Sequence, residues 1–178
     1  MSSVLRQVAV DDPRLLALVR VFAGLYANGA VYVAAFDPAD GRWEVGMDRV
    51  AREPLRHWQR FLGAVVEQGL AADLAVPDPP VAMASPTVYG GYELEATMVT
   101  RLLSGGAYAR FPGSDEEARA IAWAAVDAML GDGRLAATAY ATREAWTRWF
   151  NTGPWDQTLA AFDPTTQRWW LVCLTDTD

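Results

Sequence analysis

The chain has 178 residues, the length of a single domain, and 52% of them are hydrophobic, which excludes a mostly disordered protein. The single cysteine, Cys173, excludes an internal disulfide, and no apolar run reaches the about 18 residues that a membrane span needs. The net charge of −7 opposes binding to nucleic acids and favours a basic partner, although an acidic balance also serves solubility alone. The first ten residues lack the basic start and apolar block of a signal peptide, so we expect one cytoplasmic domain over residues 1–178.

In the first part of the chain, hydrophobic periodicity and turn residues predict alternating strands and helices. The expected elements are, in order, a strand at 4–10, a helix from Asp12 to Asn28, a β-hairpin of strands 30–36 and 42–47, and a helix at 52–72. Asp37 and Pro38 suit the first two positions of a tight turn, and Gly41 supplies the positive φ that closes it, so these residues indicate the turn of this hairpin. His57 is next to Trp58 of the apolar stripe, so we expect it at the edge of that stripe, without a catalytic role.

The middle of the chain is a proline-rich connection. Residues 76–90 hold four prolines and break every periodicity, which is typical of a long surface loop. Because proline lacks a backbone donor, this loop cannot join a central strand. A helix at 92–103 follows it.

The last part of the chain contains the clearest helix start. Ser114 and Glu117 form a capping box at the beginning of a helix that Gly131 ends. The other expected elements are a strand at 107–111, a strand at 134–140, a short helix from Thr142 to Phe150, and a closing hairpin of strands 157–162 and 168–175. We expect Cys173 and one of the two adjacent tryptophans of the last strand to be buried, since the strand is continuously apolar.

These elements predict an α+β fold, with an antiparallel or mixed sheet built from two β-hairpins and at least four packing helices. The segment AAFDP at 34–38 recurs at 160–164, and Arg42-Trp43 recurs as Arg168-Trp169 at the same offset. We interpret this echo as an internal duplication, with pseudo-repeats at 4–72 and 107–178 joined by the proline-rich loop and helix at 76–106. The alternative is that Asp-Pro is a favourable turn that the chain uses twice.

No motif of known catalytic or cofactor-binding chemistry occurs in the sequence. The glycine pairs lack the spacing of a phosphate-binding loop or a dinucleotide fingerprint, and there is no nucleophile elbow. Asp176 and Asp178 lack the further ligands of a calcium loop. We therefore expect no catalytic residue, no cofactor and no metal. The eight Trp, six Tyr and six Phe residues serve as core, as a hot spot for a partner or as a ligand cage.

The charge distribution suggests where a partner binds. Residues 61–100 hold five acids and no arginine. Carboxylates would steer a basic partner, and the tyrosines beside them would provide contact area at low entropic cost. The residues expected to bind the partner are Asp73, Asp78, Tyr89, Tyr92, Glu93 and Glu95. The alternative is a solvated connecting loop.

The C-terminal segments carry a resemblance to a known class of proteins. They are Pro154-Trp155-Asp156-Gln157-Thr158, Phe162-Asp163-Pro164, Arg168-Trp169-Trp170 and Thr175-Asp176-Thr177-Asp178. They resemble the ends of small bacterial immunity proteins, which inhibit polymorphic toxins in the cytoplasm. The resemblance implies a non-catalytic inhibitor that binds a basic toxin domain directly. The alternative function is a small-molecule sensor or enzyme with an aromatic-walled pocket between the hairpins, using Asp156, Arg168 or His57 as polar groups.

Overall fold

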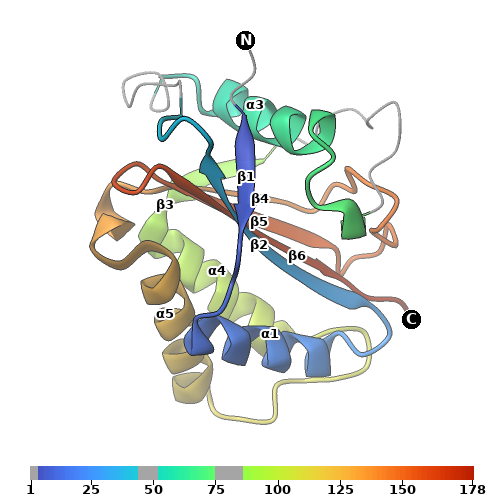
Figure 1. Cartoon of the computed structure of the whole chain (residues 1–178). Coiled ribbons are helices and arrows are strands. Elements are labelled where there is room, and N and C mark those ends of the chain that lie inside the picture. Colours follow the sequence, from blue (N-terminus) through green and yellow to red (C-terminus); the bar gives the residue numbers. More distant parts are fainter. Residues whose placement is uncertain (1–3, 44–51, 75–85) are drawn as a thin grey trace.

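A six-stranded antiparallel sheet with helices on both faces organises the part of the chain that the structure describes (Figure 1). The computed structural model describes residues 4–43, 52–74 and 86–178. In chain order the elements are β1 (Leu5–Val8), α1 (Pro13–Leu25), β2 (Ala30–Pro38), α3 (Pro54–Glu67), the 3-10 helix η1 (Ala72–Leu74), β3 (Thr87–Gly90), α4 (Gly91–Ser104), α5 (Asp115–Leu130), the 3-10 helix η2 (Gly131–Leu135), β4 (Thr138–Thr142), β5 (Gln157–Asp163) and β6 (Arg168–Thr175). The predicted α+β class with packing helices is confirmed.

The sheet has the strand order β1-β2-β6-β5-β4-β3. The predicted closing hairpin is confirmed, since β5 pairs with β6 from Gln157 opposite Leu174 to Asp163 opposite Arg168. The second strand of the other expected hairpin, at 42–47, lies mostly outside the described residues. In the described sheet β2 has β1 on one side and β6 on the other, so both of its edges are occupied.

The core is divided into two layers by the sheet. Helices α1, α4 and α5 cover one face, and α3 covers the other (Figure 1). Trp169 belongs to the α3 side, where its ring stacks on Phe61 with centroids 4.0 Å apart. Trp170 belongs to the opposite side. Both tryptophans and Cys173 are buried, because neighbouring side chains of a strand point to opposite faces and each face has its cover.

The predicted helix starts are confirmed in atomic detail. The Asp12 carboxylate accepts a hydrogen bond from the Arg14 backbone N–H at 2.8 Å and caps α1. The Ser114 hydroxyl accepts from the Glu117 N–H, and the Glu117 carboxylate accepts from the Ser114 N–H, which completes the capping box of α5.

Two expected elements are absent from the described chain. Residues 107–111 are not a strand, because the Gly106 N–H donates to the Ala109 carbonyl and closes the chain into a turn. Residues 143–150 are not a helix. There the hydroxyls of Thr142 and Thr147 accept hydrogen bonds from backbone N–H groups two residues ahead, and such local bonds compete with helix formation.

We predict that Cys173→Ser lowers the free energy of unfolding by about 1–3 kcal/mol, because it places a more polar hydroxyl on a fully buried strand. Denaturant unfolding of the variant and of Cys173→Ala, which adds no polar group, would measure the difference. Burial also raises the pKa of the Cys173 thiol, so a bulky thiol reagent should react only after unfolding. Rapid labelling of the native protein would contradict this placement.

Candidate functional site

The structure places the residues expected to bind a partner on two sides of the sheet. Asp73 lies in η1, which follows α3 and belongs to the α3 side. Tyr92, Glu93 and Glu95 lie on α4, which packs on the opposite face. Asp78 lies outside the described residues. Only the α4 residues therefore form a common surface that can be described.

Tyr89 is the fourth member of the expected set on the α4 side. It lies in β3, and its ring packs partly against the core beneath α4. Its hydroxyl is buried, and burial raises the pKa of this hydroxyl. Tyr89 thus packs in the core and forms one wall of a pocket, so it offers little exposed surface to a partner.

On the α4 side, two exposed aromatic side chains lie around one arginine. Tyr92 of α4 and Trp123 of α5 are 59% and 52% exposed. The guanidinium carbon of Arg134, in η2, lies 5.8 Å from the centroid of each ring, which is within the range of a cation–π contact. We call these three residues the Tyr92–Arg134–Trp123 cluster.

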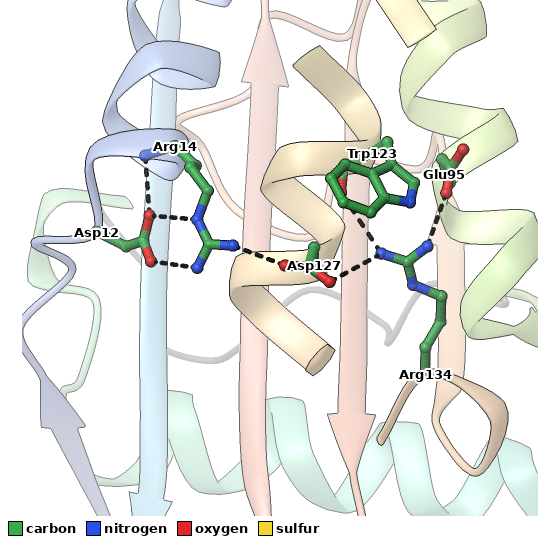
Figure 2. A network of polar contacts seen from close by, with 6 residues as sticks. All are labelled: Asp12, Arg14, Glu95, Trp123, Asp127 and Arg134. Carbon is green, nitrogen blue, oxygen red and sulfur yellow. Dashed lines mark hydrogen bonds and ion pairs between the residues drawn. The ribbon is translucent and has the colours of Figure 1, made fainter. Parts of the chain in front are cut away.

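Carboxylates hold Arg134 in this position (Figure 2). The Arg134 guanidinium donates to Glu95 at 3.1 Å, forms a longer ion pair with Asp127 at 3.8 Å, and donates to the Trp123 carbonyl oxygen at 3.4 Å. The arginine side chain is only 10% exposed, so these contacts are shielded from water more than an ordinary surface ion pair. The guanidinium is therefore fixed before any partner arrives.

The same network continues to α1. The second oxygen of Asp127 accepts from Arg14 at 2.6 Å, and Arg14 also pairs with Asp12 at 2.8 Å (Figure 2). Alternating charges thus connect α1, α5, η2 and α4 across the outer side of the three helices. Gly91 contributes to this geometry, since a Cβ atom there would lie 2.5 Å from the Arg134 carbonyl oxygen. Only glycine lets α4 start so close to η2.

This arrangement suits protein recognition. Trp, Tyr and Arg are the residue types that dominate binding hot spots. The elements α4, α5 and η2 together carry seven carboxylates and three arginines, so the surroundings of the cluster are acidic. Groups of three or more metal-ligating side chains are not found among the described residues.

The residues expected from the sequence include Tyr92 and Glu95 of this arrangement but not Trp123, Asp127 and Arg134. One indication was available: Trp123 lies off the stripe of buried apolar residues on α5, which includes Ala118, Ala122, Ala125 and Met129. A large aromatic side chain on the polar side of a helix points to an exposed contact. The ion pairs of Arg134 depend on tertiary contacts, which no local pattern shows.

His57 was expected at the edge of the apolar stripe of its helix, but its side chain is buried in the core. Its Nδ1 lies 2.6 Å from the Tyr140 hydroxyl oxygen, and its ring lies among Trp169 and Phe162. Burial, with a smaller effect from the charge of Arg60, lowers the pKa of His57 to about 3. The imidazole is therefore neutral and serves the core.

The other polar groups of the alternative pocket are also engaged within the fold. Asp156 is buried and accepts from the Thr175 hydroxyl at 2.6 Å. Arg168 forms a two-pronged ion pair with Asp37 at 2.7 and 2.9 Å. These contacts explain the roles of both residues without a ligand between the hairpins.

No protein-family model, curated protein or solved structure matches this chain. Within the described ranges, none of the helices combines the length and the apolarity needed to cross a membrane. Function is therefore inferred from the geometry of the site.

We predict that His57 makes folding sensitive to mild acid. In the folded protein the pKa of His57 lies below the ordinary value of 6.5, so the unfolded chain binds the extra proton first as the pH falls. Stability should decrease by about 2 kcal/mol from pH 7 to pH 5 on this account. Denaturant unfolding at both pH values would measure the loss.

The variant His57→Gln should lose most of this pH dependence, whereas Tyr140→Phe, which keeps the imidazole buried, should retain it. An equal dependence in the wild type and His57→Gln would contradict the neutral buried state.

Proposed function

We propose that this chain is a non-catalytic inhibitor that binds a basic protein, in the manner of the cytoplasmic immunity proteins that its C-terminal segments resemble. The observation that carries the proposal is the Tyr92–Arg134–Trp123 cluster, in which two exposed aromatic side chains lie against one fixed arginine. The partner would be a toxin domain with a cationic surface.

The cluster is prepared for binding. Glu95 and Asp127 fix Arg134, and Arg134 in turn lies against the rings of Tyr92 and Trp123. A partner therefore does not have to order these side chains, which lowers the entropic cost of association. More than half of each ring-bearing side chain remains exposed for burial beneath the partner.

Charge determines the kind of partner. The chain carries −7 overall, and Glu93 is exposed one position after Tyr92. Lysines or arginines of the partner would find carboxylates at the rim and aromatic rings at the centre, and both attract cations. Nucleic acid would be repelled by the same surface.

The segments that resemble immunity proteins contribute to the fold and not to this surface. In these segments Asp156, Phe162, Trp169 and Asp176 are all buried. They hold β5 and β6 in the middle of the sheet. We therefore propose that the contact with a toxin lies on the helices, at residues outside the resemblance.

We predict that Tyr92→Ala and Trp123→Ala each weaken the complex by roughly thirtyfold or more, which corresponds to about 2 kcal/mol for a hot-spot residue. The wild type would be used for affinity capture, with the product of the neighbouring gene as the first candidate, and the affinities would be measured by calorimetry. Tyr108→Ala is the matched control, because Tyr108 is a 66% exposed tyrosine on the connection between α4 and α5.

The proposal fails if the captured protein binds both cluster variants as tightly as it binds the wild type. It also fails if the Tyr108 variant loses as much affinity as they do.

We further predict that Glu93→Arg slows association with the basic partner at low ionic strength, because it reverses a charge that steers the encounter. The difference from the wild type should shrink at high salt, where exposed charges are screened. Glu67→Arg on α3 is the control, since this exposed glutamate lies on the opposite side of the sheet. Equal rate changes in the two variants would indicate a general charge effect and no local steering.

A further inference from the structure

A polar pocket lies toward the C-terminal end of α4, away from the aromatic cluster near its N-terminal end. Its volume is about 410 Å³, enough for a small organic molecule. The residues that line it are Thr87, Tyr89, Thr97, Arg101, Ala141, Thr142, Arg143, Glu144 and Gln157. They come from β3, α4, the end of β4, the connection that follows β4, and the start of β5.

Two arginines in this pocket have no carboxylate partner in the described part of the chain. Arg14, Arg134 and Arg168 each form ion pairs, but neither Arg101 nor Arg143 does. The Nε of Arg101 is buried and makes no hydrogen bond with the residues that the structure describes. Burial and then the charge of Arg143 lower the pKa of Arg101, and both side chains line the same pocket.

The remaining groups leave the pocket with an excess of donors. The Thr142 hydroxyl oxygen accepts from the Glu144 N–H, and its own hydrogen remains available for donation. The Gln157 amide is already donating to two backbone carbonyls, so it helps to shape the pocket instead. Glu144 is the one carboxylate of the lining, which leaves a formal charge of +1 in a chain of −7.

We propose that this pocket binds a phosphate group between Arg101 and Arg143, either as the free ion or as the ester of a small molecule. The planar guanidinium group matches the oxygens of phosphate and donates two hydrogen bonds at once. An anion there would offset the positive charges of the two arginines that line the pocket. The space beyond a phosphate would take the organic part of an ester, against Tyr89 and Ala141. This site is independent of the proposed protein partner.

The test is a thermal unfolding and calorimetry series on the full chain, with sodium phosphate, adenosine monophosphate and sodium chloride at equal ionic strength. Phosphate should raise Tm above the chloride value in the wild type. Arg143→Gln and Arg101→Gln should each weaken phosphate binding by about tenfold or more, because each removes charge-assisted hydrogen bonds. Arg119→Gln on the exposed side of α5 is the control and should bind as the wild type does.

The two sources of phosphate are separated by the ligands. Tighter binding of the monophosphate than of the free ion supports an ester as ligand, and equal binding supports the phosphate ion itself. The proposal is overturned if phosphate has no effect beyond that of chloride, or if Arg143→Gln binds as well as Arg119→Gln. Because Arg143 is exposed, its variant decides the question even if Arg101→Gln does not fold.

Discussion

The burial of two adjacent tryptophans on β6 is the constraint on which the rest of this structure depends. Trp169 and Trp170 point to opposite faces of a central strand, so each face of the sheet needs a cover. Phe61 of α3 stacks on Trp169, and the layer of α1, α4 and α5 encloses Trp170. A sheet exposed on one side would leave one of these large aromatic surfaces in water, at a loss of about 1.5–3 kcal/mol for such a side chain.

The three-helix layer in turn creates the surface to which we assign function. Its inner side is filled by apolar residues, among them Phe22 of α1, and its outer side is tied together by the ion pairs from Asp12 through Arg14 and Asp127 to Arg134. Single exposed ion pairs contribute little, but a connected set that includes the shielded Arg134 keeps the helices in register. The aromatic cluster near the start of α4 and the arginine pocket near its end are both consequences of where this helix packs.

Local chemistry made much of the fold predictable. The caps at Asp12 and Ser114, and the apolar run around Cys173, specify two helices and a buried strand without long-range information. Predicted elements were wrong where tertiary contacts or local side-chain hydrogen bonds determine the conformation. At 143–150, for example, threonine hydroxyls accept hydrogen bonds from the backbone. The sequence indicated only part of the candidate site, because the rest of the site depends on contacts between residues far apart in the chain. Glu95 lies 39 residues from Arg134 in the sequence, and the sheet separates Asp73 from α4, which a charge count along the chain cannot show.

The central claim is that the outer side of α4, α5 and η2 contacts a basic protein. Hydrogen–deuterium exchange of the chain alone and in complex with the captured partner tests it most directly. The account predicts added protection at the start of α4 and across η2 and the adjoining part of α5, with α3 unchanged. Protection confined to α3 or to β1, with the helical face as open as in the free chain, would contradict it.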